Sequence, residues 1–159
     1  MGIDNWTLMH IGMSVKNMEE TVTYLKSLGA KTGDYPSFVL NSGKGVNLLR
    51  TYGKTGAPPW KIRVSMLQLG PLTLEVAEPI DGGNYNEIYL KEHGEGANHI
   101  AYLVDNIEDE IKEMASKGIA VMYHLEGIWA YLDTTATGGL VIEFFQRGVD
   151  IRKIIAAMQ

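Results

Sequence analysis

The sequence contains an internal duplication, which constrains the possible folds more than any other feature. Residues 9–20, Met-His-Ile-Gly-Met-Ser-Val-Lys-Asn-Met-Glu-Glu, align with residues 98–109, Asn-His-Ile-Ala-Tyr-Leu-Val-Asp-Asn-Ile-Glu-Asp, at an offset of 89 positions. Further along the chain, residues 70–75 align with residues 138–143 at an offset of 68. Self-similarity of this kind indicates one supersecondary unit that occurs twice, so we expect two copies of one module.

Both copies predict the same order of elements. Residues 8–15 and 98–104 are apolar and β-branched, as in strands, and each is followed by an asparagine at a helix N-cap position, Asn17 or Asn106. Further strand candidates follow at 37–40, 46–51, 61–69 and 72–78 in the first copy, and at 119–125, 128–133 and 140–146 in the second. Each copy is therefore predicted to be a βαβββ module, and a sheet covered by helices on one face belongs to the α+β class.

The repeat also predicts how the 159 residues are divided. We expect a single domain with one module at 6–79, a second at 96–147 and a C-terminal helix at 149–159. The first copy has 21 more residues between its histidine and its glutamate, and we place this excess within 36–59. One face of the C-terminal helix is apolar and must pack on the body of the protein or on a second subunit. On this basis we expect a homodimer.

Composition excludes several classes of partner and site. The 14 basic and 19 acidic residues give a net charge of −5, which argues against nucleic acid or an anionic membrane as a partner. No apolar run reaches the ~20 residues that a membrane span needs. The first residues lack the layout of a signal peptide, so we expect a cytoplasmic protein. Because the chain has no cysteine, any bound metal must have nitrogen and oxygen ligands.

A histidine occupies the first strand of each copy, His10 in one and His99 in the other. Because side chains alternate along a strand, His10 shares its face with Gly12, and His99 shares its face with Ala101. These small neighbours predict free space in front of the sheet beside each histidine.

A glutamate occupies the last strand of each copy, Glu75 in one and Glu143 in the other. Glu143 lies within the run Leu-Val-Ile-Glu-Phe-Phe, where a carboxylate is costly to bury unless it is paired, protonated or metal-bound. A lone histidine or glutamate in a strand most often has a purely structural or solvent-facing role. The recurrence of both residues in both copies favours a shared metal site made by His10, Glu75, His99 and Glu143. Such a donor set suits one divalent ion, Zn, Ni, Co, Mn or Fe.

Four segments carry a resemblance to a known family: residues 10–15, 74–79, 92–101 and 137–143. The sequence resembles the vicinal oxygen chelate superfamily, the group of glyoxalase I, methylmalonyl-CoA epimerase, extradiol dioxygenase and bleomycin-resistance proteins. It looks most similar to methylmalonyl-CoA epimerase. The resemblance implies paired βαβββ modules that form a cupped mixed sheet around one metal ion, with the four residues above as ligands. Family members close this site either within one chain or across a dimer, and the sequence leaves both open.

The reaction that the resemblance implies is proton transfer at the carbon next to a carbonyl group, as in isomerases, epimerases and lyases. The metal would polarise the substrate oxygen, and Glu143 is the candidate base. The substrate would be a small carbonyl compound, an acyl-CoA being one candidate. Epimerases of this family carry a second catalytic glutamate, but the corresponding stretch here is Ala-Pro-Pro-Trp at 57–60.

Further side chains are candidates for substrate binding. Lys61 and Arg63 alternate on one face of a predicted strand and could hold a carboxylate or phosphate, or they could be ordinary solvent-facing charges. His124, Trp129 and Tyr131 lie on predicted strands of the second copy and could line a pocket.

Two other functions are consistent with this family. One is a ring-cleaving dioxygenase, which uses two histidines and one carboxylate on Fe(II). The other is a ligand-binding resistance protein without catalysis, whose relatives usually lack the metal ligands. The presence of candidate ligands at all four positions favours an isomerase or lyase over both.

Overall fold

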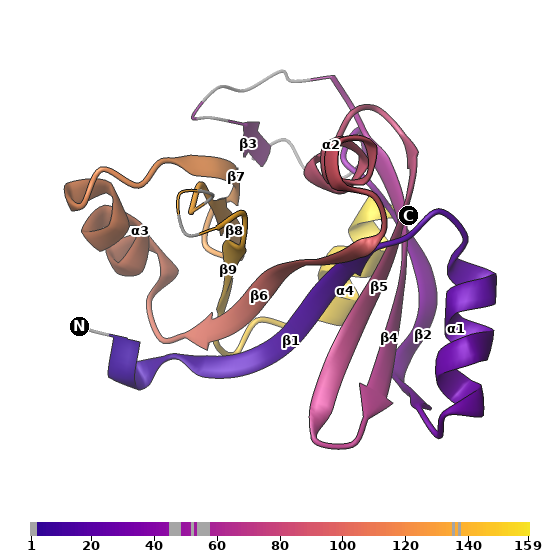
Figure 1. Cartoon of the computed structure of the whole chain (residues 1–159). Helices are drawn as coiled ribbons and strands as arrows, with labels where there is room; N and C mark the ends of the chain where they lie inside the picture. The colour runs from indigo at the N-terminus through magenta and orange to yellow at the C-terminus, as the bar shows by residue number, and fades with distance from the viewer. Residues whose placement is uncertain (1–2, 45–48, 52, 54–57, 135, 137) are drawn as a thin grey trace.

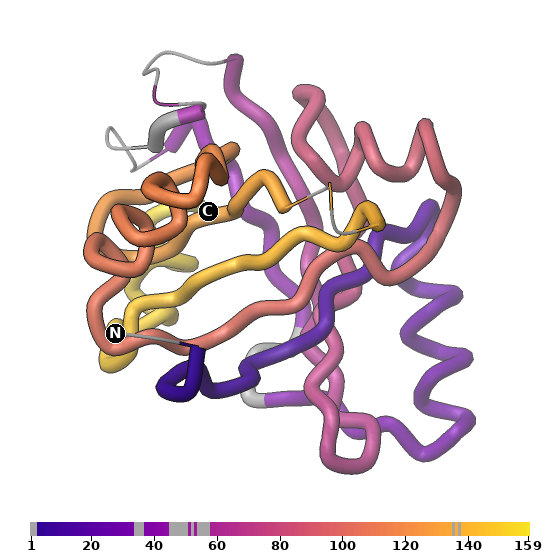
Figure 2. The backbone as a smooth tube through the Cα atoms, turned by 60° about the vertical axis from the view of Figure 1, so that its left-hand side comes forward, coloured from indigo at the N-terminus to yellow at the C-terminus, as the bar shows by residue number. Residues whose placement is uncertain are grey.

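The two repeated strands form the centre of a single mixed sheet (Figure 1). In the computed structural model, which describes residues 3–44, 49–51, 53, 58–134, 136 and 138–159, β1 (Thr7–Ser14) pairs antiparallel with β6 (Gly96–Val104). On the outer side of each central strand lies a parallel neighbour, β5 (Leu72–Asp81) beside β1 and β9 (Val141–Gln146) beside β6. Figure 2 shows β1, β6 and β9 running side by side.

The remaining strands extend both halves of the sheet in matching order. The sheet order is β2-β4-β5-β1-β6-β9-β8-β7-β3, so that β2-β4-β5-β1 mirrors β7-β8-β9-β6. The bounds of the outer strands are Lys31–Asn41 for β2, Leu49–Thr51 for β3, Lys61–Leu69 for β4, Val121–Leu125 for β7 and Trp129–Leu132 for β8. The α+β class, with a cupped sheet of two related halves, is thereby confirmed.

Strand β3 comes from the segment in which the first copy is longer. It pairs antiparallel with β7, at the opposite end of the sheet order from the rest of its own module. Of the predicted strand at 46–51, residues 46–48 lie outside the described residues. Strand β2 is longer than predicted because the chain extends directly from the end of the first helix into pairing with β4.

Helices α1 (Met18–Ser27) and α3 (Ile107–Ser116) cover the outer face of the sheet, one on each half (Figure 1). Both begin at a predicted asparagine cap, because the side chains of Asn17 and Asn106 each accept a hydrogen bond from the backbone N–H three residues later. Buried apolar residues lie beneath each helix, with Leu67 under α1 and fully buried Phe144 among those of the α3 side.

Two further helices complete the fold. Helix α2 (Tyr85–His93) connects the modules, and α4 (Ile151–Met158) lies on the concave side, between the two halves of the sheet (Figure 1). The apolar face of α4 packs on its own chain, where it contacts β2 and leaves Met158 only 1% exposed. This packing removes the observation on which the expected homodimer rested, and the dimer stays a prediction. No helix in the described part of the chain combines the length and hydropathy needed to cross a membrane.

Candidate metal centre

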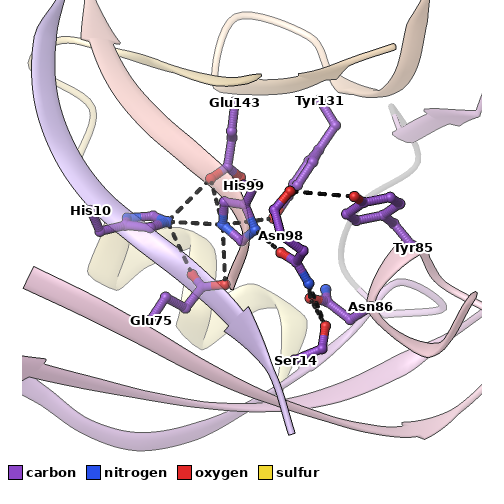
Figure 3. Close-up of polar contacts among 9 residues, drawn as sticks. All are labelled: His10, Ser14, Glu75, Tyr85, Asn86, Asn98, His99, Tyr131 and Glu143. Atoms are coloured by element: carbon purple, nitrogen blue, oxygen red, sulfur yellow. Dashed lines mark hydrogen bonds and ion pairs between the residues drawn. The ribbon is translucent and has the colours of Figure 1, made fainter. Parts of the chain in front are cut away.

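Four side chains from four different strands converge on the concave side of the sheet (Figure 3). The Nε2 atoms of His10 and His99 are 3.2 Å apart. Glu143 Oε2 lies 3.2 Å from His10 Nε2 and 3.5 Å from His99 Nε2, and the Glu75 carboxylate oxygens lie 3.6 and 3.7 Å from the same two nitrogens. Both modules of one chain therefore contribute to the cluster, so it closes without a second subunit.

The register of the sheet explains this convergence. Each histidine lies opposite a small residue of the other central strand, and a glutamate lies on the far side of that small residue. Gly12 lies between His99 and Glu75, and Ala101 lies between His10 and Glu143. The space predicted beside Gly12 is occupied by the His99 ring, since a Cβ atom on Gly12 would lie 1.7 Å from His99 Cε1.

The arrangement of donor atoms fits a divalent cation. Ligands at ~2.1 Å from a tetrahedral or octahedral metal lie roughly 3.0–3.4 Å from each other, close to the spacings found here. Glu143 Oε2, which faces both histidines, is also buried without a hydrogen-bond partner, which is costly in the absence of another partner. His10, His99 and Glu143 together could hold a metal ion, and Glu75 adds a second carboxylate at comparable distances.

Burial shifts every titratable group of the cluster towards its neutral form. Desolvation raises the pKa of Glu75 to about 7, against a lowering by nearby His10 and with a further rise from Glu143. Desolvation also raises the pKa of Glu143 well above its usual value and lowers the pKa values of His10 and His99. A bound divalent cation would oppose the shift of the carboxylates because it stabilises their ionised form.

A hydrogen-bond network fixes the orientation of His99. The ring nitrogen Nδ1 of His99 lies 2.6 Å from Asn98 Oδ1, so Nδ1 carries the proton and Nε2 faces the cluster with its lone pair. The Asn98 amide donates to Ser14 Oγ and to Asn86 Oδ1, and the Ser14 hydroxyl donates to Asn86 Oδ1 at 2.9 Å. His10 has no such support, because its Nδ1 is unpartnered.

The cluster opens into a cavity of about 540 Å³ on the concave side of the sheet. Trp129 and Tyr131, two of the candidate substrate-binding residues, line it, and the Tyr131 hydroxyl lies 3.4 Å from His99 Nε2. Desolvation raises the pKa of Tyr131 well above 10, with a further rise from Glu143, so the phenol stays protonated and can donate a hydrogen bond.

Three of the predicted substrate-binding residues do not line this cavity. Lys61 and Arg63 project from the outer face of β4, and Arg63 Nη1 lies 3.4 Å from Glu78 Oε2 on the neighbouring strand. His124 Nε2 lies 2.9 Å from Glu108 Oε1 of α3. The alternation along β4 explains the first two positions, because it is Ile62 and the apolar residues in step with it that face the cavity.

Sequence reasoning missed several residues that surround the cluster. Trp60 lines the cavity. It belongs to the stretch 57–60, which corresponds to the second catalytic glutamate of the family's epimerases. Tyr85 and Asn86 enter from α2, which the repeat does not contain. The sequence did contain one indication of the supporting network, the polar residue Asn98 beside His99 on a predicted central strand. Asn98 is buried in the structure, and a buried polar side chain requires a hydrogen-bond partner.

Comparisons with known proteins agree with this architecture. A sequence model of the Glyoxalase/Bleomycin resistance protein/Dioxygenase superfamily matches residues 9–130, so the resemblance expected from the sequence is confirmed. The uncharacterized protein YqjC of Bacillus subtilis (strain 168) is 22% identical over 89 residues, which are 52% of this chain and 64% of that protein. The match therefore spans less than two thirds of the curated relative.

Solved structures of two enzymes are similar in fold. Methylmalonyl-CoA epimerase from Mycobacterium tuberculosis has a TM-score of 0.68 at 16% identity, over 96% of both chains. A mutant 4-hydroxymandelate synthase from Streptomyces coelicolor has a TM-score of 0.61 at 17% identity, over 97% of this chain and 54% of the synthase. At these identities the likeness shows the shared fold.

The close approach at Gly12 gives a first testable prediction. The Gly12→Ala variant should displace the His99 ring and weaken the binding of Mn²⁺ or Zn²⁺ by at least about tenfold, measured by isothermal titration calorimetry. Gly96→Ala on β6 is the matched control, because its Cβ atom would make an ordinary contact at 3.5 Å with Tyr89. Equal metal affinity in both variants would contradict the proposed role of His99.

The Asn98 network gives a second prediction. Asn98→Ala removes the oxygen that accepts the hydrogen bond from His99 Nδ1, so metal affinity should fall by about 10- to 100-fold. Asn98→Asp keeps an acceptor oxygen and should retain more of the affinity than Asn98→Ala. Thermal unfolding of both variants checks that the comparison is made on folded protein, and an Asn98→Ala protein with wild-type affinity would rule out this positioning role.

Proposed function

Because the chain belongs to the Glyoxalase/Bleomycin resistance protein/Dioxygenase superfamily, we propose that it is a divalent-metal-dependent isomerase, epimerase or lyase. It moves a proton at the carbon next to a carbonyl group. The observation that carries this proposal is the convergence of His10, Glu75, His99 and Glu143 at the wall of a mainly apolar cavity. A cavity of this size with few convergent polar groups is typical of small-molecule sites.

The four side chains suggest that the metal acts as a Lewis acid. His10, Glu75 and His99 would hold the ion, with Glu143 as a fourth ligand or as a base released when the substrate arrives. When bound, a divalent ion polarises the substrate carbonyl and stabilises the negative charge of an enolate or enediolate.

Glu143 is the proposed base. Its carboxylate accepts the proton from the carbon next to the carbonyl, and the electron pair of the broken C–H bond moves towards the carbonyl oxygen. In an isomerisation Glu143 then returns the proton to the neighbouring carbon, whereas an epimerisation requires a second group that donates a proton to the opposite face of the planar intermediate. The environment that raises the pKa of Glu143 also makes its ionised form a stronger base. Tyr131, 3.4 Å from His99 Nε2, is placed to donate a hydrogen bond to a substrate oxygen.

The cavity wall favours reactions that need a single base. Epimerisation through a planar intermediate uses a group on each face, and the stretch at 57–60, which corresponds to the second glutamate of the family's epimerases, has no carboxylate and contributes Trp60 to the cavity wall. An isomerase or lyase can remove and return the proton with one group. A thioester substrate such as an acyl-CoA remains one candidate, supported by the structural likeness to methylmalonyl-CoA epimerase.

A dioxygenase is the second candidate, for a specific reason. His10, His99 and Glu143 form a group of two histidines and one carboxylate, the set that holds Fe(II) in many oxygenases, and a hydroxymandelate synthase shares the fold. Glu75 weighs against this reading, because a fourth protein ligand leaves fewer positions for oxygen and substrate.

The proton-transfer reaction predicts a specific isotope exchange. In D₂O, metal-loaded protein should catalyse deuterium incorporation next to the carbonyl of at least one α-hydroxyketone, hemithioacetal or acyl-CoA, followed by NMR. The Glu143→Gln variant keeps an oxygen ligand but cannot accept the proton, so exchange should fall by about 10²- to 10⁴-fold while metal content is largely retained.

Glu78→Gln is the matched control for this experiment, since Glu78 lies three residues beyond Glu75 on β5 and pairs with Arg63. Unchanged exchange in Glu143→Gln would exclude Glu143 as the base. Oxygen uptake with catechols by the Fe(II)-loaded wild type, without any exchange, would support the dioxygenase instead.

The raised pKa of Glu75 predicts a pH dependence of metal binding. With a pKa of about 7, Glu75 is mostly protonated at pH 6 and mostly ionised at pH 8. Because the ligand must lose its proton to bind a cation, metal affinity should rise about tenfold over this range on account of Glu75. Burial lowers the pKa values of the two histidines, so their own titration is moved towards lower pH than that of Glu75. In the Glu75→Gln variant the rise in metal affinity between pH 6 and pH 8 should be smaller by that factor. Calorimetry at both pH values measures it, and a rise equal to that of the wild type would contradict the prediction.

A further inference from the structure

The walls of the cavity are apolar and aromatic beyond the metal cluster. Trp60 and Trp129 line it from opposite halves of the sheet, and both are 8% exposed. Further apolar side chains from β2, β4 and β9 line the same cavity: Phe38, Leu40, Ile62, Val64, Met66 and Phe145. Most of the surface that a substrate group meets in this part of the cavity is apolar, although Trp60 Nε1 is a buried donor without a partner. Such a surface favours an apolar group, which loses no hydrogen bonds to water on entering.

Positive charge is scarce in the cavity. Among the described lining residues, Lys31 is the one lysine or arginine, and it is exposed at the start of β2. Lys61 and Arg63, which the sequence offers as candidate partners for a substrate phosphate or carboxylate, project from the other face of β4. An anionic substituent that lies away from the metal cluster would therefore lack a buried partner, and an uncompensated buried charge is strongly unfavourable.

Helix α4 forms the remaining wall. Ile154, Ile155 and Met158 line the cavity, while Ala157 is exposed to solvent. The end of the helix is tied to the chain beyond β2, because Lys44 Nζ donates a hydrogen bond to the Gln159 carbonyl at 2.9 Å. This helix lies outside both copies of the repeat. Its side chains line the cavity but do not contribute to the metal cluster, which both copies share.

We propose that the substrate is an uncharged carbonyl compound with an aryl or bulky alkyl substituent. The substituent packs between Trp60, Trp129 and α4, while the carbonyl oxygen faces the metal cluster. This inference rests on the function proposed above and narrows its substrate class. It sets aside nucleotide-bearing thioesters, whose phosphates would find no buried lysine or arginine among the described lining residues. Ile154 and its neighbours on α4 would then determine which substituents fit.

Binding of three probes to Mn²⁺-loaded protein tests this inference by calorimetry. 2-Hydroxyacetophenone carries a neutral aryl group, dihydroxyacetone has no apolar body, and acetyl-CoA is a charged thioester. The aryl ketone should bind at least about tenfold more tightly than dihydroxyacetone, because the cavity removes its ring from water, and also more tightly than acetyl-CoA. Tighter binding of acetyl-CoA, or equal affinity for the aryl ketone and dihydroxyacetone, would overturn the proposal.

Variants of α4 locate the binding site. Ile154→Trp fills the cavity and should weaken binding of 2-hydroxyacetophenone at least about tenfold, whereas Ala157→Trp adds the same side chain on the exposed face and should leave it unchanged. If Ile154→Trp does not fold, Ile154→Ala should still weaken binding by about threefold. Wild-type affinity in a folded Ile154 variant would overturn the proposal.

Metal content of the same samples separates this inference from the proposed function. Protein that binds Mn²⁺ without preferring the aryl ketone overturns the substrate class alone. Protein that prefers the aryl ketone without binding Mn²⁺ supports the apolar binding site and overturns the metal proposal alone.

Discussion

The antiparallel pairing of β1 with β6 is the interaction on which the rest of the structure depends. It joins the two halves into one sheet and sets the register in which His99 lies opposite Gly12 and His10 opposite Ala101. A slip of one residue would turn each histidine to the other face of the sheet. The parallel strands β5 and β9 then place a glutamate beside each small residue. The candidate metal centre is therefore a consequence of sheet register, not of any loop.

Burying the four side chains of the metal cluster costs desolvation free energy, which their contacts with one another do not offset. Two carboxylates lie 3.2–3.7 Å from two imidazole nitrogens in a desolvated site, and burial drives all four groups towards their neutral forms. Such clusters are retained in proteins where function requires them, even when they reduce stability. A divalent cation would turn the same contacts into favourable ones, because it compensates the carboxylates and accepts both imidazole lone pairs.

The fold assigns different tasks to the two faces of its sheet. Helices α1 and α3 cover the outer face and bury most of the aliphatic core there. The concave face is lined by aromatic and aliphatic side chains and by α4, and it encloses the cavity beside the cluster. An apolar, largely water-free site strengthens electrostatic interactions at the reacting atoms. The same apolar lining that would support proton transfer thus also restricts the substrate, through the bulk and charge of its substituent.

The sequence by itself determined the fold class, the two modules' strands, the asparagine caps at 17 and 106, and the grouping of His10, Glu75, His99 and Glu143 as one candidate site. Local periodicity and the recurrence of the same residues in both copies carry that information. Only the tertiary structure decided that one chain closes the cluster, that Asn98 orients His99, and that α4 walls the cavity. It also decided that Lys61 and Arg63 face away from the cavity. These features depend on register, on which face of a strand is covered and on the orientation of individual side chains, and local sequence patterns do not specify any of these.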